Sequence, residues 1–188
     1  VYYSDLDNYI VGIIDETKDR KFMPNAEPAH PKVFRNLEDA YKTGFEAGLN
    51  LNFLEFWQFS TDVSYVYTRN EDLNEALPLT SPLRSNFILA YEDKSFTSSL
   101  SLNVVAEQDQ LAGSFGESSA TPGYELLDLK LSYDLMENLN VGAGVLNIFD
   151  VNYYDHLNFA FRNQAANDLS TGSRLTNPGR NISFFAKY

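Results

Sequence analysis

The sequence predicts an all-β fold in which long antiparallel strands run up and down along the chain. Apolar and polar residues alternate with period two, the alternating runs are long, and short and long connections alternate between them. In residues 57–69, the odd positions from Trp57 to Tyr67 are aromatic or apolar apart from Thr61, and the even positions are mostly small and polar. Because successive side chains of a strand point to opposite faces, this run predicts a sheet with two unlike faces.

The same alternation predicts about eight strands. The alternating runs are, in chain order, residues 1–14, 42–53, 57–69, 86–92, 96–107, 126–135, 139–145 and 181–188. Most of them exceed the ordinary strand length of about 5–6 residues. The first run, residues 1–14, alternates less regularly than the others, and we still expect one strand there.

The connections between these runs alternate in length. Short connections fall near residues 54–56, 92–95 and 136–138, and long ones span 15–31, 70–81, 108–123 and 150–178. This order is typical of a transmembrane β-barrel, which has short periplasmic turns and long extracellular loops. If the last strand ends in the periplasm, all three short connections are periplasmic. The predicted fold class is therefore an antiparallel, up-and-down transmembrane β-barrel segment of about eight strands.

The composition excludes several classes of protein. The formal charge is −12, which disfavours a nucleic-acid partner because phosphate contacts need a basic surface. The sequence contains no run of about 18 apolar residues, which a membrane-spanning helix would need. Cysteine is absent, so a disulfide framework and a thiol nucleophile are excluded. Val1 opens a strand-like run without a basic segment or an apolar core, so we expect no signal peptide here.

Alternation by itself also fits a soluble β-sandwich or a lipocalin-like binder, in which the apolar face points inward. Three features favour the membrane instead. The strands reach the length of about 9–11 residues that crosses a bilayer at a tilt. The polar faces are rich in Gly, Ser and Asn. Aromatic residues gather near the short connections, as at a membrane–water boundary: Phe53, Phe56, Trp57, Phe59, Tyr91, Phe96 and Tyr133. A self-contained eight-stranded outer-membrane barrel, structural or adhesive, stays open as another alternative.

The last third of the chain carries more specific strings. Residues 121–135 (TPGYELLDLKLSYDL), 139–157 (LNVGAGVLNIFDVNYYDHL) and 177–188 (NPGRNISFFAKY) resemble the C-terminal end of the barrel of TonB-dependent outer-membrane receptors. Residues 41–52 and 4–10 resemble earlier strands of that family more loosely. The residues that carry the resemblance are Gly144, Asn147, Phe149, Asp150, Tyr153, Pro178, Gly179, Arg180 and Tyr188.

The resemblance implies a function in the bacterial outer membrane. Receptors of this family take up a scarce nutrient, such as a ferric siderophore or another metal complex, through a plugged barrel of 22 strands. Their partners are the surrounding lipid, the ligand, the TonB system, which acts through the plug, and the insertion machinery, which recognises the aromatic C-terminal strand. About eight strands are too few for such a barrel. We therefore expect residues 1–188 to be a C-terminal portion, without the plug and the N-terminal strands, that transports nothing by itself.

The resemblance gives the motif residues mainly structural roles. We expect Asn147, Phe149 and Asp150 to cap a strand and start a loop, and Pro178 and Gly179 to set the turn into the last strand. No catalytic residue and no cofactor is expected, because the sequence lacks G-x-S-x-G, H-E-x-x-H and P-loop motifs.

Candidate metal ligands are few. His30, His156 and Met23 could bind copper, but they lack the spacing of a ligand pair, so we expect ordinary loop residues. Acidic loop residues could hold calcium, but a solvated acidic loop is the preferred interpretation: Asp15, Glu16, Glu71, Asp72 and Glu75. The charged residues of the polar faces are expected to pair across strands: Lys42, Glu46, Asp62, Asp128, Lys130 and Lys187.

Overall fold

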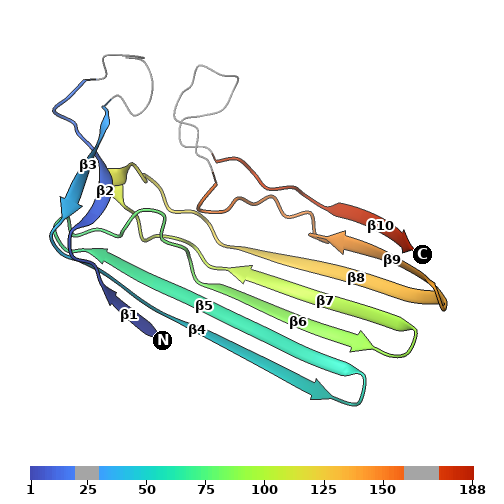
Figure 1. Cartoon of the computed structure of the whole chain (residues 1–188). Coiled ribbons are helices and arrows are strands. Elements are labelled where there is room, and N and C mark those ends of the chain that lie inside the picture. The colour runs from blue at the N-terminus through green and yellow to red at the C-terminus, as the bar shows by residue number, and fades with distance from the viewer. Residues whose placement is uncertain (20–29, 159–173) are drawn as a thin grey trace.

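Eight strands form one antiparallel sheet in the computed structural model, which describes residues 1–19, 30–158 and 174–188 (Figure 1). In sheet order the strands are β1 (Tyr2–Asp5), β4 (Ala40–Phe53), β5 (Trp57–Asn70), β6 (Arg84–Glu92), β7 (Phe96–Val105), β8 (Tyr124–Met136), β9 (Leu139–Leu146) and β10 (Asn181–Lys187). From β4 to β10, each strand pairs with the next one along the chain. The predicted all-β, up-and-down architecture is confirmed.

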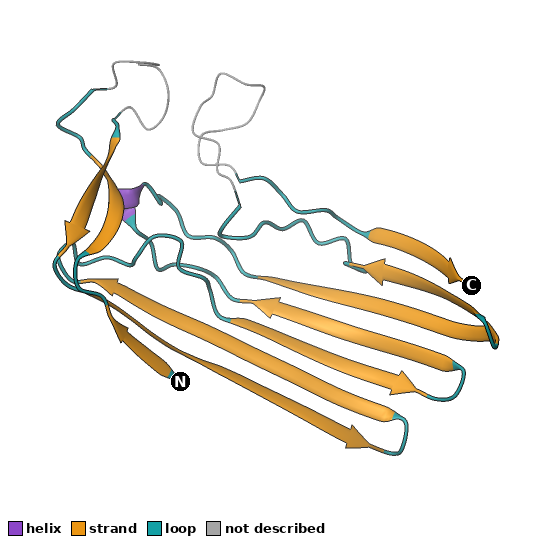
Figure 2. Ribbon diagram, viewed as in Figure 1, coloured by secondary structure: helices purple, strands orange, loops and turns teal. Residues whose placement is uncertain are grey.

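The short connections also lie where the alternation predicts them. The β4–β5 hairpin pairs from Ala40 opposite Asn70 to Phe53 opposite Trp57, so only three residues make its turn. Leu54 and Glu55 in this turn have φ of 49° and 61°. Such left-handed backbone suits the right-handed twist of the flanking strands. Figure 2 shows the short turns at one end of the sheet and the longer connections at the other.

The N-terminal run is where the prediction is wrong. Residues 1–14 form two strands in different sheets, because the chain turns at Asn8, whose φ is 54°. The second strand, β2 (Tyr9–Ile14), pairs with β3 (Lys32–Leu37) in a separate hairpin at the loop end of the large sheet (Figure 1). The alternation does not predict β3, because its sequence KVFRNL mixes apolar with charged or polar residues on both faces. The connection 15–31 therefore lies within this hairpin.

The strand register turns the alternation into two continuous faces. One row across seven strands contains only apolar side chains: Leu51, Phe59, Leu89, Leu100, Leu129, Val145 and Ile182. The next row, on the opposite face, is small or polar: Asn52, Gln58, Ala90, Ser99, Lys130, Gly144 and Ser183. We call these two surfaces the apolar face and the polar face.

The apolar face is not a dry core. Phe45 is 37% exposed and Phe184 is 80% exposed, and neither Val63 nor Leu129 is buried. The buried hydrophobic cluster lies elsewhere, where the β2–β3 hairpin meets the loops: Val11, Leu37, Ala40 and Leu77. A soluble barrel or sandwich would bury its apolar face, so this distribution counts against the lipocalin-like alternative.

The large sheet is open. In the described part of the chain, β1 and β10 are its two edges and pair with no further strand. These eight strands therefore do not close into the self-contained barrel that the sequence left open. The only helix of the described residues is one 3₁₀ turn, η1 (Gly113–Phe115), and none is long and apolar enough to cross a membrane.

Candidate functional site

The longer connections converge at one end of the sheet and bury a group of polar side chains there. We call residues 68–83, 106–123 and 147–158 the loop layer. Its buried polar residues are Thr68, Asn70, Thr80, Gln108, Glu117, Thr121, Asn147 and His156. A buried polar group is costly unless it is hydrogen-bonded, so these residues mark the part of the molecule whose shape is most closely determined by specific contacts.

Glu117 and His156 join three loops of this layer. The carboxylate of Glu117 accepts the backbone N–H groups of Leu79 and Ala112, each at 2.9 Å. The Nε2 atom of His156 lies 3.7 Å from the same carboxylate, and its Nδ1 atom is 2.8 Å from the Thr121 hydroxyl. Burial raises the pKa of Glu117, but the nearby His156 ring and the hydrogen bonds from the Ala112 and Leu79 N–H groups outweigh it and leave the pKa lowered.

Gln108 and two threonines continue the network towards the sheet. The Gln108 amide donates to the Thr80 carbonyl at 2.6 Å, and its oxygen accepts the Gln110 N–H at 2.9 Å. The hydroxyls of Thr68 and Thr80 are 2.6 Å apart. Because Thr68 belongs to β5, these bonds tie the loop layer to the end of a strand.

Asp155 anchors the last loop to the polar face. Its carboxylate accepts Arg84 of β6 at 2.5 Å and the Tyr124 hydroxyl of β8 at 3.4 Å. Burial raises the pKa of Asp155, but the contact with Arg84 and the Leu157 N–H lower it overall. The neighbouring residue His156 points to the 106–123 loop, so two adjacent side chains hold this loop against different partners.

The family-motif residues form the bend that follows β9. Asn147 is buried, has φ of 52°, and bonds Val151 through both ends of its side-chain amide at 2.8 and 2.9 Å. Asp150 accepts the Arg180 N–H at 2.7 Å, and a Cβ at Gly179 would lie 2.6 Å from the same carboxylate oxygen. The bend is thus tied to the chain that enters β10.

The other motif residues lie in several parts of the structure. Gly144 lies in β9 opposite Lys130 and Ser183. Phe149 is 72% exposed, and Tyr153 packs against Tyr124 with ring centroids 4.6 Å apart. Pro178 is exposed just before β10, and Tyr188 follows that strand and is exposed. Their value as a family signature stays a prediction at the level of single residues.

The metal candidates do not come together. His30 lies beside the β2–β3 hairpin, with Nδ1 3.0 Å from the Lys18 carbonyl, whereas His156 is buried in the loop layer. Met23 lies outside the described residues. Among those that the structure describes, no three His, Asp or Glu side chains form a group that could hold a metal ion. The interpretation of His156 as an ordinary loop residue is wrong in one respect, because it is 1% exposed and structurally central.

The acidic loop residues serve separate structural contacts rather than one calcium site. Asp15 is 2.9 Å from Lys18, Asp72 accepts the Glu38 N–H at 2.6 Å, and Glu75 accepts the Ser114 N–H at 3.0 Å. Because Asp15 is buried, the expectation of a solvated loop is wrong for that residue.

The predicted cross-strand charge pairs are absent among the described residues. The ion pairs there are Lys18–Asp15 and Arg84–Asp155, and the two histidine–carboxylate contacts are His30–Asp19 and His156–Glu117, all at the loop end. The six charges of the polar face lie opposite uncharged neighbours instead; for example, Glu46 faces Ser64, and Asp62 is 3.4 Å from the Asn86 amide. Alternation predicts the face of a residue, but the pairing partner depends on register.

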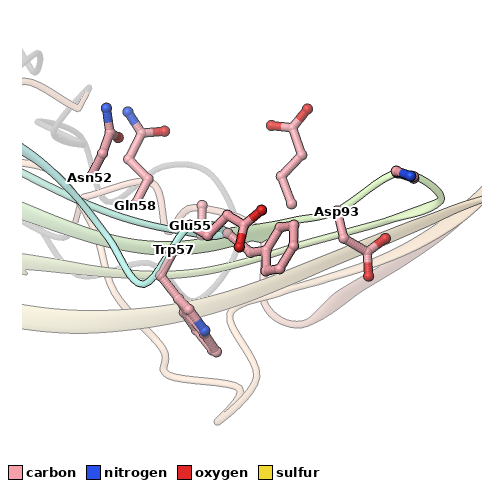
Figure 3. Close-up of a pocket in the computed structure, with 9 residues that line it drawn as sticks. Asn52, Glu55, Trp57, Gln58 and Asp93 are labelled. Carbon is pink, nitrogen blue, oxygen red and sulfur yellow. The ribbon is translucent and has the colours of Figure 1, made fainter.

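A hollow lies at the opposite end of the sheet from the loop layer, beside the short turns (Figure 3). It measures about 470 Å³ and is lined by polar-face residues, including Asn52 and Gln58, and by turn residues, including Glu55 and Asp93. In Figure 3, Asn52 and Gln58 point away from one side of the ribbon and Trp57 from the other. Asp93 accepts the N–H groups of Ser95 and Phe96, which lowers its pKa and closes the turn.

Aromatic rings border the apolar face at both ends. Near the short turns, Trp57 and Tyr91 have ring centroids 5.1 Å apart, and Phe53, Phe56 and Phe96 contact this pair. At the loop end, Tyr3, Tyr41 and Tyr67 follow one another at 5.8 and 6.2 Å. We call these two groups the turn-side and the loop-side aromatic belts. Belts of this kind flank the apolar band of barrel proteins.

The two-faced sheet, the belts and the loop layer define a segment of a large antiparallel β-barrel. The comparisons with known proteins name its family. The family model described as "TonB dependent receptor-like, beta-barrel" matches residues 1–148. The chain therefore belongs to the TonB-dependent receptor β-barrel family. No curated protein matches the chain.

Several solved structures match nearly the whole chain. The "Copper transporter OprC" is 26% identical, with a TM-score of 0.81 over 98% of this chain and 28% of that chain. A variant of the ferric enterobactin receptor PfeA from Pseudomonas aeruginosa is 21% identical, with a TM-score of 0.66 over 98% of this chain and 27% of that one. The ferric-catecholate import receptor Fiu from K12 E. coli is 16% identical, with a TM-score of 0.64 over 98% and 24%. The chain thus spans about a quarter of the length of each of these proteins.

Proposed function

We propose that this chain is the C-terminal barrel portion of a bacterial outer-membrane receptor that imports a scarce metal complex with energy from TonB. The observation that carries the proposal is the continuous apolar face across the strands of an open, family-matched sheet. Unpaired strand edges are costly in lipid, so we assign the missing pairing partners of β1 and β10 to other strands of the same receptor.

The distance between the aromatic belts supports a membrane-spanning sheet. Twelve residues separate Tyr41 from Phe53 in β4, and ten separate Tyr67 from Trp57 in β5. At about 3.3 Å per residue and a tilt of about 40°, these spans correspond to about 30 and 25 Å along the membrane normal. The apolar band of outer-membrane barrels is about 25 Å tall, so both spans fit it.

The loop layer supports a receptor role for the other end. Connections that only return the chain to the sheet need few buried contacts, yet this layer buries Glu117, His156 and Gln108 in one network. Such rigid support is what a binding surface carried on loops needs. We assign ligand contact to this end. TonB coupling belongs to a plug outside this chain, and recognition by the insertion machinery belongs to β10 and Tyr188.

The ligand we propose is a metal complex, and copper is the first metal to test. The match to a copper transporter has a higher TM-score than the matches to the two iron–siderophore receptors, 0.81 against 0.66 and 0.64. Among the residues that the structure describes, no three His, Asp or Glu side chains are grouped as metal ligands.

The test is metal uptake by cells that carry or lack the complete receptor. Cells are given a copper salt or ferric enterobactin, with and without a protonophore that removes the energy supply of TonB. We expect receptor-dependent, protonophore-sensitive uptake of copper, and loss of it on deletion. Uptake of both metals that is unchanged by deletion would overturn the proposed function. If only the uptake of ferric enterobactin depended on the receptor, copper would be overturned as the ligand and the receptor function would stand.

A further inference from the structure

A groove of about 700 Å³ lies at the loop end of β7 and β8. Most side chains that line it are apolar: Leu102 and Val104 from β7, Leu127 from β8, and Phe149 and Val151 from the bend after β9. Glu125, which is exposed, is its one carboxylate. Three separate segments of the chain therefore build a concave apolar surface rather than a flat one.

The groove opens on the apolar face. Leu102 pairs with Leu127 on one side and with Phe87 on the other, and the row continues through Thr61 to Leu49. Because side chains in one cross-strand row point to the same face, Leu102 and Leu127 share the surface of Leu49. The groove is thus continuous with the surface that the proposed function places against lipid.

The lip and the floor of the groove are held in place by specific features. Phe149 is 72% exposed. It lies in a bend in which Asn147 and Asp150 have φ of 52° and 56°. At the floor, a Cβ on Gly123 would lie 2.6 Å from the Val105 carbonyl oxygen. A glycine at this position therefore lets its backbone approach the backbone of Val105 closely. Left-handed non-glycine residues are unfavourable and persist only when contacts impose them, as the hydrogen bonds of Asn147 and Asp150 do.

The groove lies in the half of the apolar band that is far from the short turns. Leu127 is six residues and Gly123 ten residues from Tyr133, which stands opposite the belt residue Phe96. At about 3.3 Å per residue and a tilt of about 40°, the groove lies about 15–25 Å above that belt. With the short turns in the periplasm, this depth corresponds to the outward leaflet.

We propose that this groove binds one acyl chain of lipid A, the phosphorylated glycolipid of the outward leaflet, with Phe149 covering the chain. The proposal rests on the proposed function, because it needs the apolar face to meet lipid. The exposed side chain of Arg180 follows the same bend, since its N–H bonds Asp150, and it offers a cation to a headgroup phosphate at that height.

The test uses the complete receptor, purified in a mild detergent, stripped of lipid and then mixed with purified lipid A. Native mass spectrometry counts bound lipid in the wild type, in Phe149→Ala, which removes the lip, and in Val104→Trp, which fills the groove. Phe184→Ala is the matched control, because Phe184 is 80% exposed on the same face in β10, outside the groove. Heat-dependent migration on gels confirms that each variant is folded.

We expect lipid A to bind about tenfold more weakly to Phe149→Ala, since a buried aromatic contact is worth at least that factor. Val104→Trp should retain none, and Phe184→Ala should equal the wild type. Equal retention by all four proteins would overturn the proposal, as would equal binding of phosphatidylethanolamine and lipid A by the wild type. Metal uptake by the same variants separates failure of this proposal from failure of the proposed function. If the groove binds no lipid A while metal uptake is intact, only the lipid A proposal is refuted.

Discussion

The sheet of this molecule leaves apolar side chains exposed, whereas the loop layer buries polar ones. Across the sheet, large apolar residues such as Leu49 and Phe184 remain exposed, whereas the loop layer buries polar residues such as His156 and Gln108. The sheet obtains its backbone hydrogen bonds from its neighbours, strand by strand. The loops lack such a ladder, and side chains such as Glu117 satisfy their N–H groups instead.

This difference is what lipid around the sheet and water around the loop layer would produce. In lipid, an apolar side chain needs no burial within the protein, and a polar one must face inward. In water, a loop keeps a defined shape only if its polar backbone groups find partners.

The largest effect is expected from a charge placed on the apolar face. Leu49→Arg puts a cation near the middle of the apolar band, which should lower the free energy of unfolding by about 2–4 kcal/mol. Asn50→Arg, one residue away on the polar face, should change it by less than about 1 kcal/mol. Urea unfolding of the complete receptor in lipid vesicles measures both. Similar losses for the two variants would remove the distinction between the faces.

The next effect concerns the centre of the loop layer. Glu117→Ala leaves the N–H groups of Leu79 and Ala112 without their acceptor, and at the buried Ala112 N–H this should cost about 1–3 kcal/mol. Hydrogen exchange at these two amides should accelerate, while amides of β5 stay protected. Glu117→Gln keeps one carbonyl oxygen and should lose less protection. Unchanged exchange in Glu117→Ala would show that the loops are held by other contacts.

The same carboxylate predicts a pH dependence that the sheet should lack. The pKa of Glu117 is held below its ordinary 4.5, so its stabilising contribution is complete above that pH. The contribution is lost as the pH falls through the lowered pKa, because the protonated acid accepts these hydrogen bonds poorly. Protection factors of Leu79 and Ala112 should fall in acid in the wild type, and Glu117→Gln should abolish that pH dependence.

A smaller effect is expected where the last loop meets the sheet. Asp155 and Arg84 form a charge-assisted hydrogen bond at 2.5 Å. A double-mutant cycle with Arg84→Gln and Asp155→Asn should give a coupling energy of about 1.5 kcal/mol, because both groups are partly shielded from water. A coupling energy near zero would mean that this ion pair does not help to anchor the loop.

The smallest effect concerns the β2–β3 hairpin. The hydrogen bonds from Lys18 and Thr17 lower the pKa of Asp15 from 3.8 to about 2. A carboxyl with a lowered pKa stabilises the hairpin above pH 3.8 and loses that contribution as the pH falls toward 2. Lys18→Ala should move the pKa of Asp15 back toward 3.8 in a titration followed by carboxyl-carbon resonances, whereas Lys94→Ala should leave it unchanged.

The sequence predicts the sheet well because period two is a local property. The runs that became β4, β5 and β8 alternate over most of their length, so their faces and their turns can be located from the sequence pattern. The short strand β3 has no such signal. The break at Asn8 was also invisible, because one residue with positive φ leaves no mark on a hydrophobic pattern.

The loop layer could not be predicted in the same way. Glu117 and His156 are 39 residues apart, and their contact depends on where two long connections fold back. A lone histidine in a polar stretch gives no sign of burial. The prediction of charge pairs on the polar face was wrong for a related reason. The strand register decides which residue stands opposite a charge, and it places Ser64 opposite Glu46.

The most direct test asks which residues of one strand pair touch lipid. Spin labels on single cysteines are placed in the complete receptor in vesicles at Leu49, Asn50, Leu51, Phe59 and Ser60, where this chain itself carries no cysteine. Collision with oxygen, which concentrates in lipid, should be frequent at Leu49, Leu51 and Phe59. Collision with a water-soluble nickel complex should be frequent at Asn50 and Ser60. The reverse pattern, or equal collision rates on both faces, would contradict a sheet that turns its apolar face to the membrane.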